Sequence, residues 1–404
     1  MKVLFVSWDG PAQNYMESLF LPVLGRVRQE GHSVDVVQFT WSANDAASIH
    51  RTSRSLGISY STREVRRKPL VVGTAVTIAA GAAHLARYVR EHKVDVLMPR
   101  SIIPLAMALL AKRSLPGVKL FFDADGLMAD ERVDFAGWSR AGAPYRVLSY
   151  IEREGVRRAD VVMVRTARAK ELLIRRSGGR VDPERIHVIP NAKDQAVFQP
   201  GTEADRREVR EGLGMDPGAP LLAYVGSVGP HYHPREMVAL FSRLWTRRPD
   251  SKLLVLTGNR DRMDEALRGY DLPESSIVVD RVPPGEVPRY LAAADLGIAF
   301  RTPSFSQQAV SPIKVGEYLL CGVPVASTKG VGDLDAQLGT DVGRLVDDLQ
   351  DSTLEGLVDW LLEDVLPRRE IYRTACRSRG VDLFGLDQCT RRLRRALADC
   401  ATAA

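Results

Sequence analysis

Residues 311–325 read SPIKVGEYLLCGVPV, and residues 294–300, shortly before them, read ADLGIAF. The run 296–300 is apolar and of strand length. Ser311 and Pro312 then stand where a capping hydroxyl and a first-turn proline are favoured, so a helix is predicted from this point to residue 320. A second apolar run, 323–327, completes a strand–helix–strand unit. Such units build parallel sheets wrapped by helices.

The start of this helix is predicted to bind an anion. Its unpaired N–H groups and the positive end of its dipole attract negative charge. Lys314 and Glu317 lie three residues apart and therefore share one face near that end. A cation there suits a diphosphate, and a carboxylate one turn deeper suits the hydroxyls of a ribose. The alternative is an ordinary surface ion pair between these two residues.

The same alternation runs outward through the whole chain. In the first half we expect strands at 2–7, 34–39, 94–99, 119–123 and 161–165, and helices at 16–30, 84–91, 104–113 and 145–158. In the second half we expect strands at 221–226, 252–258, 277–280, 296–300 and 323–327, and helices at 235–247, 287–293, 313–320 and 386–398. The predicted class is α/β, with two doubly wound Rossmann-like domains whose strand ends face one cleft.

The 404 residues suit two domains better than one. We place an N-terminal domain at 1–197 and a C-terminal domain at 198–383, with a last helix at about 384–404 returning to the first domain. The loops after the two leading strands read SWDGPAQN and GSVGPHYH. Neither is the G-x-G-x-x-G of a dinucleotide-binding dehydrogenase, which disfavours an oxidoreductase.

Composition indicates a globular, cytoplasmic protein. Hydrophobic residues make up 45% and charged residues 26% of the chain, and no secretory signal is expected from MKVLFVSWDG. The apolar stretch 70–86 is shorter than a membrane span and is interpreted as a buried helix. The four cysteines have no metal-ligand spacing, so reduced thiols and no bound metal are expected.

Charge is unevenly distributed. Residues 1–200 carry 30 Lys and Arg against 20 Asp and Glu, and the remainder carries 26 against 30. A basic first half favours an anionic lipid surface or a phosphate-bearing acceptor as partner, although a generally Arg-rich composition explains it equally well. Nucleic acid is not expected, because no recognition motif accompanies the charge.

The ordered set of motifs resembles the retaining glycosyltransferases of the GT-B fold, in particular family 4. AADLGIAF followed by SPIKVGEYLLCGVPV looks like that family's donor-binding signature. IHVIPNAKDQAVF resembles its crossover between domains, and FFDADGLMADERVD resembles a branch linked to polysaccharide assembly. YVGSVGPHYHPREM, LLVLTGN and VVDRVPPGEVPRYLAAAD resemble the remaining parts of its C-terminal domain. The likeness covers essentially the whole chain.

The resemblance implies roles for residues of the C-terminal domain. Glu317 would bind the donor ribose, and Lys314 with the N–H groups around Ser311 and Ile313 would hold the diphosphate. The loop from Gly226 through Ser227 to Gly229 would cradle phosphate, since glycine allows close backbone approach. The residues that would read the base are Arg281 and Val282.

Two departures from the family pattern stand out. The first acid of the Glu-x7-Glu motif would fall at position 309, which is Ala309, with Gln307 and Gln308 beside it. The basic residue that often follows the glycine loop is also missing. His231 and His233 stand there instead, and either one replaces the phosphate contact or both are ordinary loop residues.

In the first half, the resemblance places candidates at strand ends. Asp9 would border the reaction centre with Gly10, unless the pair is only a turn. Asp123 and Asp125 alternate along one extended segment, and we assign Asp125 to the reaction centre. The acceptor-binding candidates are Gly10, Arg100, Asp123 and Glu131. Glu131 is expected in a loop, 130–132, whose alternative interpretation is a solvated charged loop without a ligand.

The resemblance implies sugar transfer from a nucleotide-sugar donor to a glycan, a lipid-linked saccharide or a small-molecule acceptor. Transfer would retain the anomeric configuration and need no metal or other cofactor, with Lys314, Asp9 and Asp125 at the reaction centre. The enzyme would belong to the glycosyltransferases, EC class 2.4, and act in the cytoplasm or at the inner membrane face. The alternatives are a nucleotide-sugar epimerase on the same fold and a nucleotide-binding pseudo-enzyme.

Overall fold

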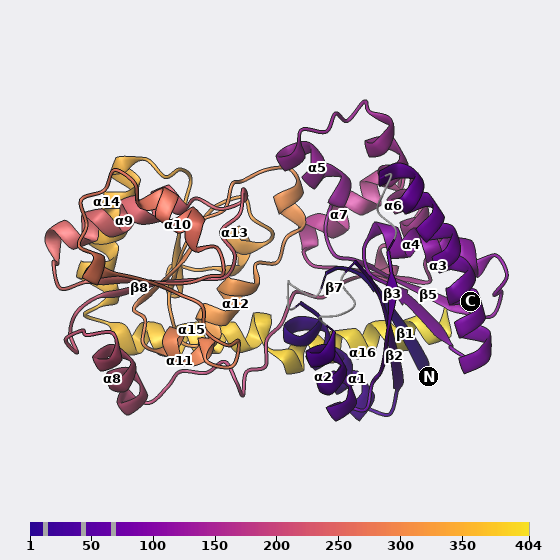
Figure 1. The fold of residues 1–404 in the computed structure, drawn as a ribbon, viewed down its shortest axis with the longest axis horizontal. Helices are drawn as coiled ribbons and strands as arrows, with labels where there is room; N and C mark the ends of the chain where they lie inside the picture. The colour runs from indigo at the N-terminus through magenta and orange to yellow at the C-terminus, as the bar shows by residue number, and fades with distance from the viewer. Residues whose placement is uncertain (11–14, 42–45, 66–69, 404) are drawn as a thin grey trace. The chain divides into compact units, whose positions relative to one another are not determined.

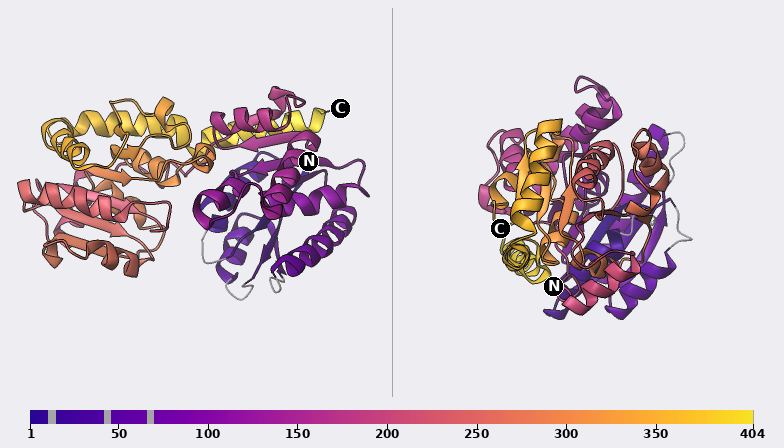
Figure 2. Two further views of the ribbon diagram at one scale, coloured as in Figure 1. Left: turned by 90° about the horizontal axis from the view of Figure 1, so that it is seen from above. Right: turned by 90° about the vertical axis from the view of Figure 1, so that its left-hand side faces the viewer.

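The computed structural model describes residues 1–10, 15–41, 46–65 and 70–403, and its ribbon is drawn in Figure 1. The chain forms two compact units. Unit 1 consists of Met1–Pro190, Gln308–Val310 and Cys389–Ala404, and unit 2 of Asn191–Gln307 and Ser311–Gln388. Each unit contains one parallel sheet with helices on both faces (Figures 1 and 2).

The sheet of unit 1 has seven strands in the order β3-β2-β1-β4-β5-β6-β7. Their bounds are Lys2–Trp8 (β1), Ser33–Thr40 (β2), Ser59–Glu64 (β3), Val96–Pro99 (β4), Lys119–Ala124 (β5), Val161–Val164 (β6) and Ile186–Val188 (β7). The central strands β4 and β6 are buried at every position. Side chains on both faces of these strands are therefore apolar, as a sheet covered on both sides requires.

The helices of unit 1 fill the connections between these strands. They are a short π-helix η2 (Met16–Phe20), α1 (Leu21–Gln29), α2 (Ala47–Ser55), α3 (Leu70–His92), α4 (Ile102–Lys112), α5 (Met128–Ala136), α6 (Ala143–Arg158), α7 (Ala167–Arg176) and most of α16 (Leu386–Thr402). The last helix contacts this unit near its end, where Lys119 Nζ donates to the carbonyl oxygen of Ala403 at 2.5 Å.

Unit 2 has a six-stranded parallel sheet in the order β10-β9-β8-β11-β12-β13. Its strands are Leu221–Val225 (β8), Lys252–Leu256 (β9), Ile277–Asp280 (β10), Leu296–Ala299 (β11), Val325–Thr328 (β12) and Gly343–Val346 (β13). Its main helices are α8 (Glu203–Gly212), α9 (Pro234–Arg247), α10 (Arg260–Leu267), α11 (Val287–Ala292), α12 (Ile313–Leu320), α14 (Asp351–Trp360) and α15 (Arg369–Phe384).

Strand β8 shows why this unit has two cores. Leu221, Ala223 and Val225 face one hydrophobic cluster, which also contains residues of α12 and α15. Leu222 and Tyr224, which point the other way, belong to a second cluster with residues of α9 and α14. Alternate side chains of a strand lie on opposite faces, so both faces are buried. The order of both sheets reverses next to the first strand of its unit, at β1/β4 and at β8/β11. Ligands of such sheets bind at this position.

Helix α8, which the apolar pattern did not predict, is held by buried charge rather than by a broad apolar face. Arg206 and Arg210 each donate to Asp295, at the start of β11, at 2.6 Å. Both arginines also donate to the carbonyl oxygen of Ala293. The ion pairs are well satisfied by additional hydrogen bonds, which is the condition for tolerating charge in a core.

Two local expectations need correction. The stretch 70–86 belongs to the single helix α3, which is only partly buried: Val72 is 60% and Val76 46% exposed. Residues 130–132, expected in a loop, lie within α5. Asp130 is completely buried there, while Glu131 is exposed. Among the described helices, none is long and apolar enough to cross a bilayer.

Asp130 takes part in a buried charge cluster that joins three helices of unit 1. One guanidinium, that of Arg176 on α7, contacts Asp130 of α5 at 2.7 Å and Glu152 of α6 at 3.0 Å. Tyr145 also donates to Asp130, at 3.2 Å. Burial raises the pKa of Glu152 to about 7, with Arg176 opposing the shift. This carboxyl therefore titrates near neutral pH.

Replacing Glu152 with Gln should make stability less sensitive to pH. The native state holds the Glu152 proton more tightly than the unfolded chain, so its contribution to stability is present at low pH and is lost as pH rises from about 4.5 to about 7. This loss is on the order of 3 kcal/mol and should be absent in Glu152→Gln. Urea unfolding of both proteins at pH 5 and pH 8 measures it. Equal pH dependence in the two proteins would contradict the assignment.

Candidate functional site

The most unusual side chain in unit 2 is Lys314, in the first turn of α12. It is 6% exposed, and its Nζ makes no hydrogen bond among the described residues. The ammonium lies over two aromatic rings, 3.7 Å from the ring centroid of Tyr224 and 3.9 Å from that of Tyr232. Burial lowers the pKa of Lys314 well below its usual value; nearby Arg301 lowers it further, and Glu317 opposes the shift. A buried cation without a carboxylate partner is costly and indicates a site for an anion.

A second cation, Arg301, follows β11 and was not among the sequence candidates. Its Nη1 donates to Tyr232 Oη at 2.9 Å and its Nε to Gln307 Oε1 at 2.7 Å. These partners are neutral, and no carboxylate pairs with Arg301 in the part of the chain that the structure describes. The sequence signal that could have found Arg301 was its position just after a buried strand, because ligands bind where the strand order of such a sheet reverses.

The glycine loop after β8 comes close to this pair of cations. Gly226 has φ +111°, a conformation that favours glycine, and a Cβ there would lie 3.8 Å from Lys314 Cε. Tyr224 Oη donates to the Ser227 carbonyl oxygen at 2.6 Å, and Asn259 Oδ1 accepts from the Val228 N–H at 3.0 Å. A Cβ at Gly229 would meet open space. The loop is thus fixed at 227–228 and leaves backbone approachable at both glycines.

The start of α12 differs from expectation in its capping. The helix begins at Ile313 after Pro312, and no side chain caps it. Ser311 Oγ instead accepts from the Asn191 N–H at 3.2 Å, and Asn191 Nδ2 donates to the Ser311 carbonyl oxygen at 2.8 Å. The prediction that Ser311 caps the helix is wrong. The consequence is that the first N–H groups of the helix are not used by a capping hydroxyl.

Glu317 does not pair with Lys314. It is 9% exposed, and its Oε1 contacts Lys193 Nζ at 2.9 Å. The alternative of a surface ion pair between Lys314 and Glu317 is therefore wrong, because Glu317 is buried with a different lysine. The site in unit 2 thus contains one neutralised ion pair and two cations, Lys314 and Arg301, without carboxylate partners.

The two histidines after the glycine loop lie on the edge of this site. His233 is occupied: its Nε2 lies 3.2 Å from Thr302 Oγ1 and its Nδ1 3.5 Å from Glu236. His231 packs edge-on against Tyr232, with ring centroids 6.4 Å apart. The residues after β10 are less enclosed, since Arg281 is exposed and Val282 packs partly against a core cluster.

In unit 1 the candidates gather at the carboxyl ends of the central strands. Arg100 and Arg165 both contact the same two acids. Arg100 lies 3.0 Å from Asp123 and 2.5 Å from Asp125, and Arg165 lies 2.7 Å from Asp123 and 3.4 Å from Asp125. Asp123 is 1% exposed, whereas the Asp125 side chain is 36% exposed. Asp125 is therefore the acid that a ligand can reach.

This network leaves little free charge. Burial opposes ionisation of Asp125, but Arg100 and Arg165 hold the pKa of its carboxyl below the usual value. Arg100 is 8% exposed and also lies 4.0 Å over the Phe20 ring. The expected contact of Arg100 with an acceptor phosphate does not fit this arrangement, because both carboxylates already occupy its guanidinium.

Backbone strain marks the same place. Ser101 adopts φ +68°, which is rare for a residue other than glycine, and donates its N–H to the Asp123 carbonyl oxygen at 2.9 Å. Such conformations concentrate at functional sites.

Asp9 forms a separate polar group with neighbouring strands. Its Oδ1 accepts from Gln38, whose own amide oxygen accepts from Tyr60. Burial raises the pKa of Asp9, with Gln38 and Arg100 opposing. Gly10 is tightly packed, since a Cβ there would meet the Trp41 ring at 2.7 Å. Glu131 is exposed on α5.

Comparison with known proteins identifies the class. The family model described as Glycosyltransferase Family 4 matches residues 22–196, and that described as Glycosyl transferases group 1 matches residues 205–379. The fold is that of GT-B glycosyltransferases. A sucrose-phosphate synthase from Thermosynechococcus elongatus aligns over 100% of both chains, with a TM-score of 0.76 and 16% identity. The Anabaena protein Alr3699/HepE, in complex with UDP and glucose, covers 98% of this chain and 99% of its own, with a TM-score of 0.74 and 15% identity.

The chain belongs to the GT-B glycosyltransferases of family 4. It is 30% identical to a D-inositol 3-phosphate glycosyltransferase from Segniliparus rotundus, over 41% of this chain and 36% of that protein. It is also 30% identical to an alpha-maltose-1-phosphate synthase from Mycolicibacterium smegmatis, over 30% of each chain. The alignments with these two curated relatives thus span only about a third of their length.

Replacing Lys314 with Met should stabilise the ligand-free protein. Met keeps the contacts with the two tyrosine rings and removes the cost of a buried amine, so the free energy of unfolding should rise by about 1 kcal/mol at pH 7. The lowered native pKa of Lys314 also means that the unfolded chain binds more protons, so its contribution to stability grows as pH rises towards 10.5. This growth should be absent in Lys314→Met. Urea unfolding at pH 6 and pH 9 measures both effects.

Lys329→Met is the matched control, because Lys329 is 47% exposed and pairs with Asp347 at the surface. It should change stability by less than about 0.5 kcal/mol. A marked destabilisation by Lys314→Met would show that the buried amine supports the fold rather than a ligand.

Proposed function

We propose that the protein transfers a sugar from a nucleotide-sugar donor to a hydroxyl of a glycan, a lipid-linked saccharide or a small molecule. The observation that carries the proposal is the pair of cations in unit 2, Lys314 and Arg301, which lack carboxylate partners among the described residues beside a positive-φ glycine and an uncapped helix start. Membership of family 4 supports the same reaction class.

The donor diphosphate is assigned to this corner of unit 2. Lys314 contributes a buried positive charge that becomes fully stabilised only when an anion arrives. The first N–H groups of α12 and the backbone at Gly226 supply uncharged donors, as helix starts and glycine loops do at other phosphate sites. Ser227, Gly229 and His231 extend this wall.

Glu317 is assigned to the donor ribose. Its pairing with Lys193 holds the carboxylate in one orientation, and its position one turn into α12 places it beyond the diphosphate from the helix start. Arg281 and Val282, after β10, are assigned to the nucleobase. Ala309, which is 1% exposed, stands where the family pattern has an acid. In this protein other groups must therefore make the sugar contacts that this acid makes in family members.

The chemistry requires stabilisation of a leaving group. The bond between the anomeric carbon and the diphosphate oxygen breaks, and the acceptor oxygen forms a new bond to that carbon. Attack from the face of the leaving group retains the configuration, and the acceptor proton passes to the departing phosphate. Lys314, Arg301 and the backbone N–H groups then stabilise the negative charge that develops. We propose that this happens without a metal or another cofactor.

Acceptor recognition is assigned to unit 1. Asp9 and Asp125 follow the carboxyl ends of β1 and β5, which are separated by β4, and can each accept a hydrogen bond from an acceptor hydroxyl. Arg100 and Asp123 are assigned to positioning Asp125, since Arg100 bridges both carboxylates. Gly10 allows close approach of Trp41 beside Asp9.

A panel of UDP-, GDP-, dTDP- and ADP-sugars tests the proposal by calorimetric titration, followed by turnover with and without acceptors. Turnover only with an acceptor supports a transferase. Interconversion without an acceptor would indicate an epimerase, an activity compatible with the fold because a putative UDP-N-acetylglucosamine 2-epimerase from Listeria monocytogenes aligns with a TM-score of 0.62 at 14% identity. Binding without turnover would indicate a pseudo-enzyme.

Glu317→Gln should weaken binding of the donor found in this panel by about tenfold or more. The amide cannot replace a charged acceptor for ribose hydroxyls, and such hydrogen bonds contribute about 1.5–3 kcal/mol. Glu286→Gln is the control, since Glu286 is exposed at the start of α11. Unchanged donor affinity in Glu317→Gln, with the fold intact, would remove Glu317 from the donor site.

We further propose that the protein acts in the cytoplasm and associates peripherally with an anionic membrane through α3. The exposed face of this helix carries Val72, Ala75, Val76, Ala79 and Ala83, spaced so that they form one apolar stripe. Arg87 and Arg90 continue the same face and are exposed. An apolar stripe followed by cations is typical of helices that lie in a membrane interface.

Val72→Asp combined with Val76→Asp should reduce co-sedimentation with phosphatidylglycerol vesicles at low and at high salt, because the apolar contribution is not screened. Val147→Asp on α6 is the control, since Val147 is also exposed, at 55%, but lies on a different helix. Equal sedimentation of all three proteins would exclude α3 as the membrane surface.

A further inference from the structure

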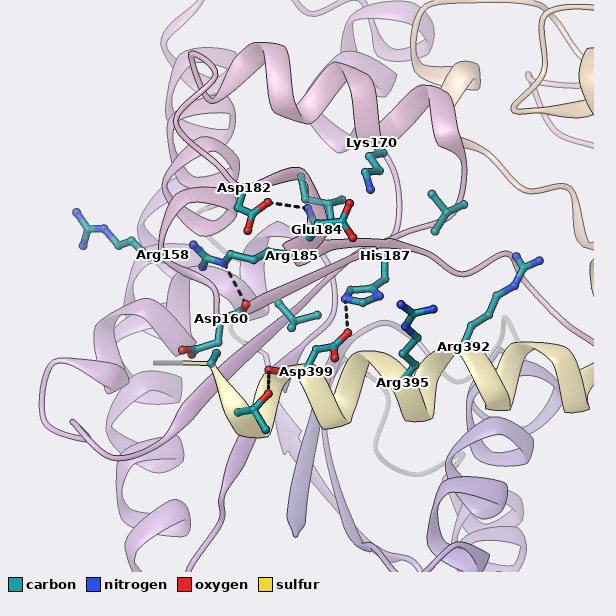
Figure 3. A pocket seen from close by; sticks show the side chains of 15 residues that line it. Arg158, Asp160, Lys170, Asp182, Glu184, Arg185, His187, Arg392, Arg395 and Asp399 are labelled. Atoms are coloured by element: carbon teal, nitrogen blue, oxygen red, sulfur yellow. Dashed lines mark hydrogen bonds and ion pairs between the residues drawn. The ribbon is translucent and has the colours of Figure 1, made fainter.

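A large polar pocket lies in unit 1, apart from the polar groups described above. It has a volume of about 930 Å³ and is formed where the edge strand β7 faces α16, with α7 and the end of α6 as its other walls (Figure 3). Neither the family motifs nor the sequence candidates assign a role to its residues.

Three cations that line this pocket have no partner. Lys170 of α7 and Arg392 and Arg395 of α16 make no side-chain hydrogen bond or ion pair within the described residues. Arg392 and Arg395 are three residues apart and therefore share one face of the helix. Figure 3 shows Lys170 pointing from one wall towards His187 and Arg395 rising from α16 on the opposite wall, with Arg392 on the same helix extending to one side.

Most of the acids in the pocket are already bound. Asp160 accepts from the Leu120 N–H at 2.7 Å and lies 3.4 Å from Lys112, and Asp182 accepts from the Glu184 N–H at 3.0 Å. Asp399 lies 3.4 Å from His187. The Glu184 side chain is the one lining carboxylate without such a contact in the described structure. Over the whole lining, five Lys and Arg side chains face four carboxylates, so positive charge is in slight excess.

His187 of β7 lies within the pocket and is mostly buried. Burial lowers its pKa; Asp399 opposes the shift, Lys170 and Arg395 add to it, and Glu184 opposes it. The imidazole lies between Lys170 and Arg395 in Figure 3. Two separate elements thus direct positive charge to one point.

We propose that this pocket is a second anion-binding site, which takes a phosphate-bearing group between Lys170 of α7 and the Arg392–Arg395 pair of α16. Guanidinium groups bind phosphate through paired, charge-assisted hydrogen bonds, and the spacing of the two arginines allows both to reach one group. Because Lys170 and the arginines come from elements far apart in sequence, the ligand would also tie the C-terminal helix to α7. The phosphate can belong to a soluble metabolite or to an anionic lipid headgroup.

Calorimetric titration with inorganic pyrophosphate tests the site, with the full-length Lys314→Met protein as background so that Lys314 does not contribute. Arg301 is present in every protein compared, so only the differences between the variants are interpreted. Saturable binding is expected, weakened about tenfold or more by Arg392→Ala with Arg395→Ala. The matched control is Arg391→Ala with Arg394→Ala. This variant removes the same charge from the same helix, but neither Arg391 nor Arg394 lines the pocket. The affinity for pyrophosphate should therefore stay nearly unchanged. Absence of saturable binding, or equal loss in both double variants, would overturn the proposal.

Vesicles distinguish the two sources of phosphate. Phosphatidylglycerol vesicles are sedimented with the same two double variants, each also carrying Val72→Asp and Val76→Asp to remove the contribution of α3. A loss of vesicle binding confined to Arg392→Ala with Arg395→Ala, and competition by pyrophosphate, assign the site to a lipid headgroup. Pyrophosphate binding without this loss assigns it to a soluble phosphate compound.

Discussion

The arrangement of unit 2 depends on one buried ammonium group. Lys314 lies between the rings of Tyr224 and Tyr232, and no carboxylate within the described part of the chain pairs with it. Burying such a charge costs free energy, and the aromatic faces return only part of it. The surrounding elements hold the group in place all the same: β8 supplies Tyr224, and the rigid apolar core beneath α12 fixes the backbone of Lys314. A structure that tolerates this cost at the reversal point of its sheet is prepared for a negatively charged ligand.

In unit 1, by contrast, the buried charges are paired with one another. At its strand ends, two arginines meet two aspartates, so that the group is almost neutral before any ligand binds. Only Asp125 remains accessible, and its orientation is determined by Arg100 and Arg165. A neutral, hydrogen-bonding surface suits hydroxyl groups, whereas the uncompensated cations of unit 2 suit phosphate. The proposed assignment of the donor to unit 2 and of the acceptor to unit 1 therefore has an electrostatic basis within each unit.

The pocket at β7 and α16 extends this contrast. Its cations are also uncompensated, but they lie on a helix from the end of the chain and on a helix from the middle of unit 1. The basic excess of the first 200 residues does not by itself locate such a place, because most of those arginines pair with acids or lie scattered on the surface. Which basic side chains keep no acidic partner is decided by the contacts that form when the chain folds.

The sequence by itself determined the two parallel sheets, most of their strands and the importance of the segment around Lys314. Buried strands leave continuous apolar runs, and a helix start after a strand leaves a local pattern of Ser, Pro and a cation. Only the tertiary structure decided that Glu317 pairs with Lys193 rather than with Lys314, that Ser311 binds Asn191 instead of capping α12, and that Arg301 joins the site. Lys193 and Glu317 are 317 − 193 = 124 positions apart in the chain, and Asn191 and Ser311 are 120 apart. No local pattern records them, because a side chain chooses its partner by distance after folding, not by spacing along the chain.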